Sequence, residues 1–137
     1  MANQVAVGID ISKKTMDVAI GHEQSTAVFS NDGAGHQALI EVLKSHQISL
    51  IVMEATGQYQ LACACALQAA GFAVVVINPR QARDFAKAMG RLVKTDSVDA
   101  RMLAELAQVL NLRPDRDRFI KPMPDQAQQY LHALVLR

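Results

Sequence analysis

Apolar and polar positions alternate over the first thirty residues in the way that is typical of short β-strands. Residues 4–11 alternate apolar side chains with small or polar ones, which predicts a strand. Residues 15–21 and 25–30 repeat this character after short polar breaks. Because the connections between them are so short, we expect these three strands to pair as an antiparallel meander.

Beyond residue 30 the pattern switches between helical periodicity and continuous apolar runs. Residues 48–54 and 72–77 are almost wholly apolar, as in strands that are buried on both faces of a parallel sheet. Helices are expected over about twelve residues after the N-cap candidates Asn31 and Asp32, and over 59–70, 80–89 and 96–111. This order predicts an α/β fold with a mixed five-stranded sheet and helices on both faces.

The proline pattern suggests where this domain ends. Residues 113–125 contain three prolines among charged residues and are expected to be a linker after a domain spanning residues 1–112. Residues 126–137 form a last helical stretch with an apolar stripe. Because that stripe stops without a cap, we expect either a chain that continues into a helical segment or packing against another chain.

Composition mainly excludes classes of protein. The chain has no apolar run of about 18 residues and no signal-peptide pattern at its start, so we expect a cytoplasmic protein without a membrane span. Cys63 and Cys65 are two positions apart on a predicted helix, where they cannot easily share a metal. They are interpreted as small core residues in a reducing compartment.

The net charge of +1 hides one basic segment. Residues 80–94 hold five of the 14 Lys and Arg residues but only one of the 13 Asp and Glu residues. On a helix, the spacing of these cations would place them along one stripe, which suits a phosphate backbone or a solvated helix face. The candidate nucleic-acid contacts are Arg80, Arg83, Lys87, Arg91 and Lys94.

Four acidic residues are candidates for metal ligands, although each has an ordinary structural explanation. Asp10 ends a strand beside small residues, and Glu54 ends a buried strand at the sheet edge where ligands gather in open α/β sheets. Asp96 and Asp99 could instead form a helix start, with Asp96 as the cap and Asp99 in the first turn. The carboxylate of Glu54, at the end of its strand, could also simply be exposed to solvent.

The combination favours metal binding over these separate explanations. If Asp10 and Glu54 end adjacent strands and the helix that begins near Asp96 lies across them, four negative charges converge. At about 4 Å each pair of like charges repels by roughly 4 kcal/mol at an effective dielectric constant near 20, so such a cluster is costly without cations. Two divalent ions held by oxygen ligands are the arrangement that nucleases use for phosphoryl transfer.

Four sequence blocks resemble the N-terminal domain of the IS110-type transposases, a group that is also similar to the Piv-type DNA invertases. The blocks are Val7-Gly-Ile-Asp-Ile-Ser-Lys13, Met53-Glu-Ala-Thr-Gly57, Ile77-Asn-Pro-Arg80 and Lys94-Thr-Asp-Ser-Val-Asp-Ala100, and the similarity covers about residues 4–112. The resemblance implies an RNase H-like fold similar to that of RuvC. It also implies a DEDD set of catalytic, metal-binding residues at Asp10, Glu54, Asp96 and Asp99.

The same resemblance implies chemistry and partners that the residue patterns alone do not show. The expected cofactor is Mg²⁺, with Mn²⁺ as a substitute and two ions in the site. The expected partners are DNA, a structured guide RNA and further copies of the chain, with Lys13 added to the nucleic-acid contacts. Family members carry a nucleophilic serine in a downstream domain that this chain does not contain, so the chain would hold part of a composite site.

Three other functions compete with strand cleavage and exchange by a recombinase. The chain could be a nucleic-acid-binding or assembly module that is inactive alone, or a junction-resolving nuclease similar to RuvC. The Gly8–Ser12 block also resembles the first phosphate loop of actin-like kinases. Those proteins need a second, similar lobe, for which 137 residues leave no room.

Overall fold

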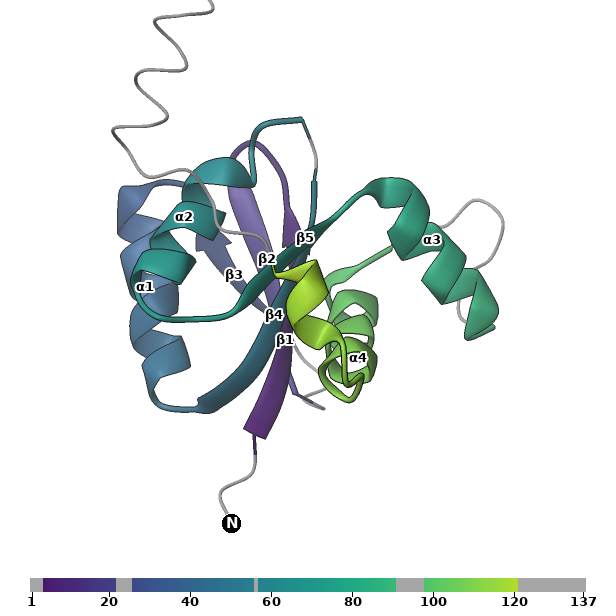
Figure 1. The fold of residues 1–137 in the computed structure, drawn as a ribbon. Coiled ribbons are helices and arrows are strands. Elements are labelled where there is room, and N and C mark those ends of the chain that lie inside the picture. The colour runs from purple at the N-terminus through teal and green to yellow at the C-terminus, as the bar shows by residue number, and fades with distance from the viewer. Residues whose placement is uncertain (1–3, 22–25, 56, 91–97, 121–137) are drawn as a thin grey trace, which may run out of the picture.

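A five-stranded mixed sheet forms the centre of the computed structural model, which describes residues 4–21, 26–55, 57–90 and 98–120 (Figure 1). The strand order is β3-β2-β1-β4-β5. Strands β1 (Gln4–Ile11), β2 (Thr15–Ile20) and β3 (Ala27–Ser30) pair antiparallel. Their meander is the one predicted from the alternating pattern.

The other half of the sheet is parallel. Strand β4 (Gln47–Glu54) runs parallel to β1, and β5 (Val74–Ile77) runs parallel to β4. The register places Ile9 beside Met53 and Glu54 beside Ile77. The carboxyl ends of all three strands therefore meet at one edge of the sheet.

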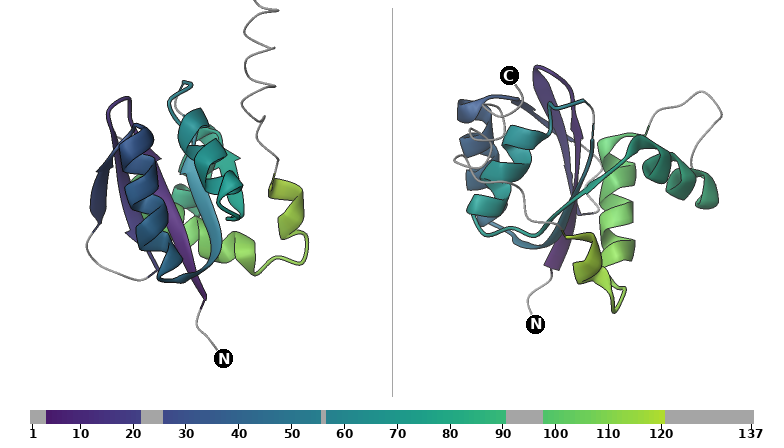
Figure 2. Two further views of the ribbon diagram at one scale, coloured as in Figure 1. Left: turned by 90° about the vertical axis from the view of Figure 1, so that its left-hand side faces the viewer. Right: turned by 45° about the horizontal axis from the view of Figure 1, so that its top comes forward.

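Helices cover both faces, as expected for this fold class (Figures 1 and 2). Helices α1 (Gly33–Lys44) and α2 (Leu61–Ala69) enclose one apolar core with β1, β2 and β4, and the buried Cys63 is part of it. Helices α3 (Pro79–Ala88) and α4 (Ala100–Asn111) enclose a second core on the opposite face with β4 and β5. In the described residues no helix is long and apolar enough to cross a membrane.

Helix α4 lies unusually close to the sheet because the residues between them are small. A Cβ atom built on Gly8 would lie 2.1 Å from the carbonyl oxygen of Ala100 and 2.2 Å from the backbone nitrogen of Ala104. Ala19, beside Gly8 on β2, packs with the same two alanines. Because residue 8 has no side chain, the first turn of α4 can pack directly against the backbone of β1.

The chain after α4 folds back against the domain as far as it is described. Residues Arg116–Phe119 form a 3-10 helix, η1. Arg116 donates from Nη1 to the carbonyl oxygen of Ser49 (3.0 Å) and to Oδ1 of Asn111 (2.8 Å). The part of the expected linker up to residue 120 is thereby held beside the start of β4. The expected helical segment 126–137 lies outside the described residues.

Candidate active site

Asp10 and Glu54 lie side by side at the edge where the parallel strands end. The β1–β4 register pairs Ile9 with Met53, and Asp10 and Glu54 are the next residues on the two strands. Gly8 and Val52 stand two residues earlier on the face that α4 covers, so by strand alternation both acids belong to that face. Both side chains are half-buried. The sequence-based expectation of adjacent strand ends is confirmed.

Asp99 lies near the same edge of the sheet, at the start of α4, where it is the N-cap. Its Oδ1 accepts a hydrogen bond from the backbone N–H of Met102 at 3.0 Å. The next residue, Ala100, is the one that approaches Gly8, and Asp10 follows Gly8 on the same face of β1. The close packing of α4 on β1 therefore places its capping carboxylate near Asp10.

The alternative interpretation, in which Asp96 caps this helix and Asp99 lies in its first turn, is wrong. The helix begins at Ala100 and not near residue 96, because the Asp99 side chain satisfies the first-turn N–H group that a cap serves. Asp96 itself lies outside the described residues.

Burial and, to a smaller extent, electrostatic repulsion raise the pKa values of Asp10 and Glu54. Burial raises the pKa of Asp10, and the charges of Asp17 and Asp99 raise it further. Burial also raises the pKa of Glu54, with a contribution from Asp10, while Arg83 acts in the opposite direction. The site therefore holds negative charge that is unfavourable in the metal-free protein.

Asp17 is a further carboxylate of this cluster that the sequence analysis missed. It is paired directly opposite Asp10 in the β1–β2 ladder, and it is half-buried. Directly opposite residues in an antiparallel pair share one face of the sheet. If residues 12–14 are taken as a tight hairpin turn, counting outward from it along both strands pairs Asp10 with Asp17.

The predicted nucleic-acid contacts divide into three groups. Arg83 on α3 is half-buried, and its charge opposes the rise in the pKa of Glu54. Arg80 and Lys87 are exposed on the same helix, and Lys13 is exposed on the turn after β1. The single helical stripe expected over residues 80–94 was wrong, because α3 ends at Ala88 and Gly90 has a positive φ of 68°. Arg91 and Lys94 lie outside the described residues.

The chemistry of the donor set fits a hard divalent cation. In the residues that the structure describes, no three His, Cys, Asp or Glu side chains are close enough together to hold one ion. The acids that do gather offer only carboxylate oxygens, which Mg²⁺ and Mn²⁺ prefer. A cation would relieve the repulsion that raises the pKa values of Asp10 and Glu54.

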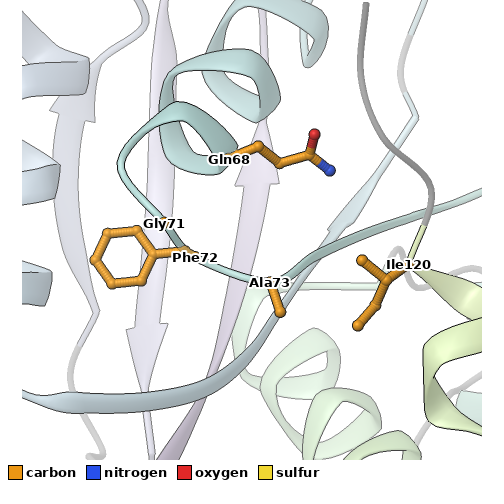
Figure 3. Close-up of a pocket in the computed structure, with 5 residues that line it drawn as sticks. All are labelled: Gln68, Gly71, Phe72, Ala73 and Ile120. Carbon is orange, nitrogen blue, oxygen red and sulfur yellow. The ribbon is translucent and has the colours of Figure 1, made fainter.

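A cavity of about 450 Å³ lies at the other end of β5 (Figure 3). It is lined by Gln68, Gly71, Phe72, Ala73 and Ile120. Ala73 immediately precedes β5, whereas Glu54 pairs with its last residue, Ile77. None of the acids lines this cavity, so it is separate from the carboxylate site.

The raised pKa values predict how the stability of the metal-free domain depends on pH. A carboxyl group whose pKa is raised on folding contributes stability below its ordinary pKa (3.8 for Asp10, 4.5 for Glu54), and this contribution disappears as the pH rises through the raised pKa. We therefore expect a Glu54→Gln variant to gain stability relative to the wild type as the pH rises from 4 to 7. Urea unfolding in EDTA would measure this difference. A constant difference over that range would contradict the prediction.

Comparison with known proteins identifies the family in which this site occurs. Residues 7–135 match the sequence model of the IS110-type DEDD transposases, described as a transposase. The chain belongs to this transposase family. The match confirms the resemblance seen in the sequence blocks, and it extends past the domain boundary expected at residue 112.

Two curated relatives of this transposase chain are the pilin gene-inverting proteins of Moraxella bovis and Moraxella lacunata. Each is 31% identical over 124 residues, which cover 84% of this chain. The chain spans only 38% of the length of each relative. More than half of each relative therefore has no counterpart in this chain.

Solved structures of RuvC share the fold of this transposase chain. Thermus thermophilus RuvC superposes with a TM-score of 0.59 and 15% identity, covering 87% of this chain and 99% of that one. RuvC of T. thermophilus in complex with a Holliday junction substrate gives a TM-score of 0.52 and 14% identity, covering 74% and 90%. The RNase H-like, RuvC-like architecture expected from the sequence is thus confirmed.

Proposed function

We propose that this transposase domain cuts and rejoins DNA strands with divalent ions held by Asp10, Glu54, Asp96 and Asp99. The observation that carries the proposal is that Asp10, at one sheet edge, interacts electrostatically both with Glu54 on the neighbouring strand and with Asp99 at the start of α4. The raised pKa values of Asp10 and Glu54 indicate that this arrangement is costly without a cation. A folded domain is expected to keep such a cluster for chemistry rather than for stability.

Each described acid has a defined part in this proposal. Asp10 and Glu54 would hold the ions from rigid strands, and Asp99 would do so from the helix start, where its cap uses only Oδ1. Two bound Mg²⁺ ions would polarise the scissile phosphate and activate the attacking oxygen. Arg83, beside Glu54, would orient a phosphate group next to the carboxylates.

The nucleic-acid surface would extend outward from this site. Lys13 follows β1 and the exposed Arg80 and Lys87 lie on α3, so cations flank the carboxylates on two elements. Arg91 and Lys94 would add to this surface. In the full-length protein we propose a structured guide RNA as a further partner, assembly of several copies, and a nucleophilic serine supplied by the part outside this chain.

Titration with Mn²⁺ by calorimetry is the experiment that tests the metal site. We expect binding by the wild type, and affinity weakened at least about tenfold by Glu54→Gln and by Asp99→Asn. The Asp99→Asn variant is informative because asparagine caps helices as well as aspartate does, so α4 should keep its start. Glu41→Gln, at an exposed position on α1, is the matched control and should bind as the wild type does.

Two results would count against the proposal. Equal Mn²⁺ affinity in the wild type and both site variants would show that these carboxylates are not ligands. If the folded wild type binds no Mn²⁺ alone, the titration is repeated with DNA and with RNA present. Nucleic-acid binding that does not depend on Mn²⁺ or on Glu54 would favour the alternative of a binding and assembly module.

A further inference from the structure

Asn31 forms four hydrogen bonds that connect segments on either side of the carboxylate site. Its backbone N–H donates to the carbonyl oxygen of Lys14 at 2.8 Å. Its Nδ2 donates to the carbonyl oxygen of Ser12 at 3.0 Å and to that of Tyr59 at 2.9 Å. Its Oδ1 lies 2.8 Å from Nε2 of His36. We call these four bonds the Asn31 bridge.

The chemistry of the partners fixes how the Asn31 amide is oriented. Two carbonyl oxygens, those of Ser12 and Tyr59, can only accept, so the amide NH₂ group must face them. The amide oxygen then faces His36, which must donate from Nε2. His36 is the one buried polar side chain among the residues that the structure describes, with 7% of its surface exposed. A buried donor thus holds the amide in the orientation that the two loops require.

The connection between β3 and α1 is built tightly enough to keep Asn31 in place. Oδ1 of Asp32 accepts hydrogen bonds from Ser30 Oγ and from the backbone N–H of Gly35, both at 2.8 Å. A Cβ atom on Gly35 would lie 1.6 Å from the carbonyl oxygen of Ser30, so only glycine lets the helix start this close to the strand. Asn31 lies between these two fixed elements.

The two loops joined by Asn31 are those that leave the acid-bearing strands. Ser12 and Lys14 belong to the turn that follows Asp10 on β1, and that turn also carries Lys13. Tyr59 belongs to the loop that follows Glu54 on β4. Since β1 and β4 are neighbours, one side chain spans the ends of both strands.

From these contacts we infer that Asn31 is a positioning residue for the carboxylate site. It holds the turn after Asp10 and the loop after Glu54 at a fixed separation, and His36 orients it. The inference rests on the proposed function for the claim that Asp10 and Glu54 bind metal. The inference adds that the spacing of Asp10 and Glu54 depends on Asn31, which is neither next to them in the sequence nor paired with them in the sheet.

The test compares Asn31→Ala with a variant that loses stability without touching the loops. Ile40→Val, at a buried position on α1, removes one methylene group from the core and serves as this control. The Asn31→Ala and Ile40→Val variants of the full-length protein are both studied at temperatures below their unfolding transitions. The first readout is the position of the side-chain carboxyl ¹³C signals of Asp10 and Glu54 at pH 7 without metal. The second is Mn²⁺ affinity by calorimetry.

A positioning role for Asn31 predicts that both carboxyl signals move in Asn31→Ala and stay in place in Ile40→Val, and that Mn²⁺ affinity falls about tenfold in Asn31→Ala alone. His36→Gln, which keeps a donor, should resemble the wild type more closely than His36→Leu does. Unmoved carboxyl signals in Asn31→Ala would overturn the inference, as would equal Mn²⁺ affinities in the two variants.

The outcomes also separate this inference from the proposed function. Wild-type protein that binds no Mn²⁺, alone or with nucleic acid, would refute the metal site. The carboxyl signals would still decide on Asn31, because they are recorded without metal.

Discussion

Replacing Gly8 by alanine is expected to destabilise the domain by about 3 kcal/mol or more. Forcing extra atoms into a packed core costs about 1–3 kcal/mol when flexible side chains can move aside. Here the added methyl group would lie 2.1 and 2.2 Å from backbone atoms of α4, which cannot rotate away. The helix would have to lift from β1. Urea unfolding of the two proteins would measure the loss.

The same substitution at Gly33 provides the control for that measurement. Gly33 is the first residue of α1, and a Cβ atom there meets nothing within 4 Å. Alanine at this position should leave stability unchanged or raise it by up to about 1 kcal/mol, because it restricts the unfolded chain. Similar losses at both positions would mean that α4 does not approach β1 as closely as described.

Replacing Asp10 by asparagine is expected to stabilise the metal-free domain and, under the proposed function, to abolish strand cleavage. Asp10 is the acid whose pKa is raised both by burial and by two neighbouring carboxylates, and it also raises the pKa of Glu54. An uncharged side chain of the same shape ends this repulsion. Stabilising substitutions commonly give about 0.5–2 kcal/mol, and solvent screening of the half-exposed Asp10 favours the lower part of that range.

Under the proposed function, Asp10→Asn in the full-length transposase should reduce strand cleavage roughly 1,000-fold or more, because it would remove a ligand of the proposed ions. Urea unfolding in EDTA at pH 7 and a cleavage assay with Mg²⁺ measure the two effects. Glu41→Gln, at an exposed acid on α1, should leave both unchanged. A variant that is less stable than the wild type and still cleaves DNA would refute both the repulsion and the role of Asp10.

Much of the fold was predictable because the buried positions of this chain form simple patterns of apolar residues in the sequence. Residues 48–54 are mostly apolar on both sides of the strand because β4 is an interior strand, between β1 and β5, with helices on both faces. Asp32, one of the two N-cap candidates in the sequence, caps the first helix. Parallel pairing then followed from the intervening helices, and it placed Asp10 beside Glu54.

The features that were missed depend on contacts between distant segments. Nothing local distinguishes Asp96 from Asp99 as the cap of α4, since the choice depends on how α4 packs on Gly8. The pairing of Asp17 with Asp10 depends on the register of one short turn. The role of His36 is not visible in the sequence, because its hydrogen-bond partner Asn31 precedes the helix that carries His36.

The packing of α4 on β1 also determines when the site can exist. Residue 10 belongs to the first strand, whereas Asp99 precedes the last α-helix that the structure describes. Proteins are synthesised from the N-terminus, and contacts between residues far apart in sequence form late in folding. Under the proposed function, a partly synthesised chain cannot assemble its carboxylates until α4 has been made. Under the same proposal, the metal site of an unfinished chain stays incomplete, so strand cleavage is not expected before α4 has been made and packed on β1.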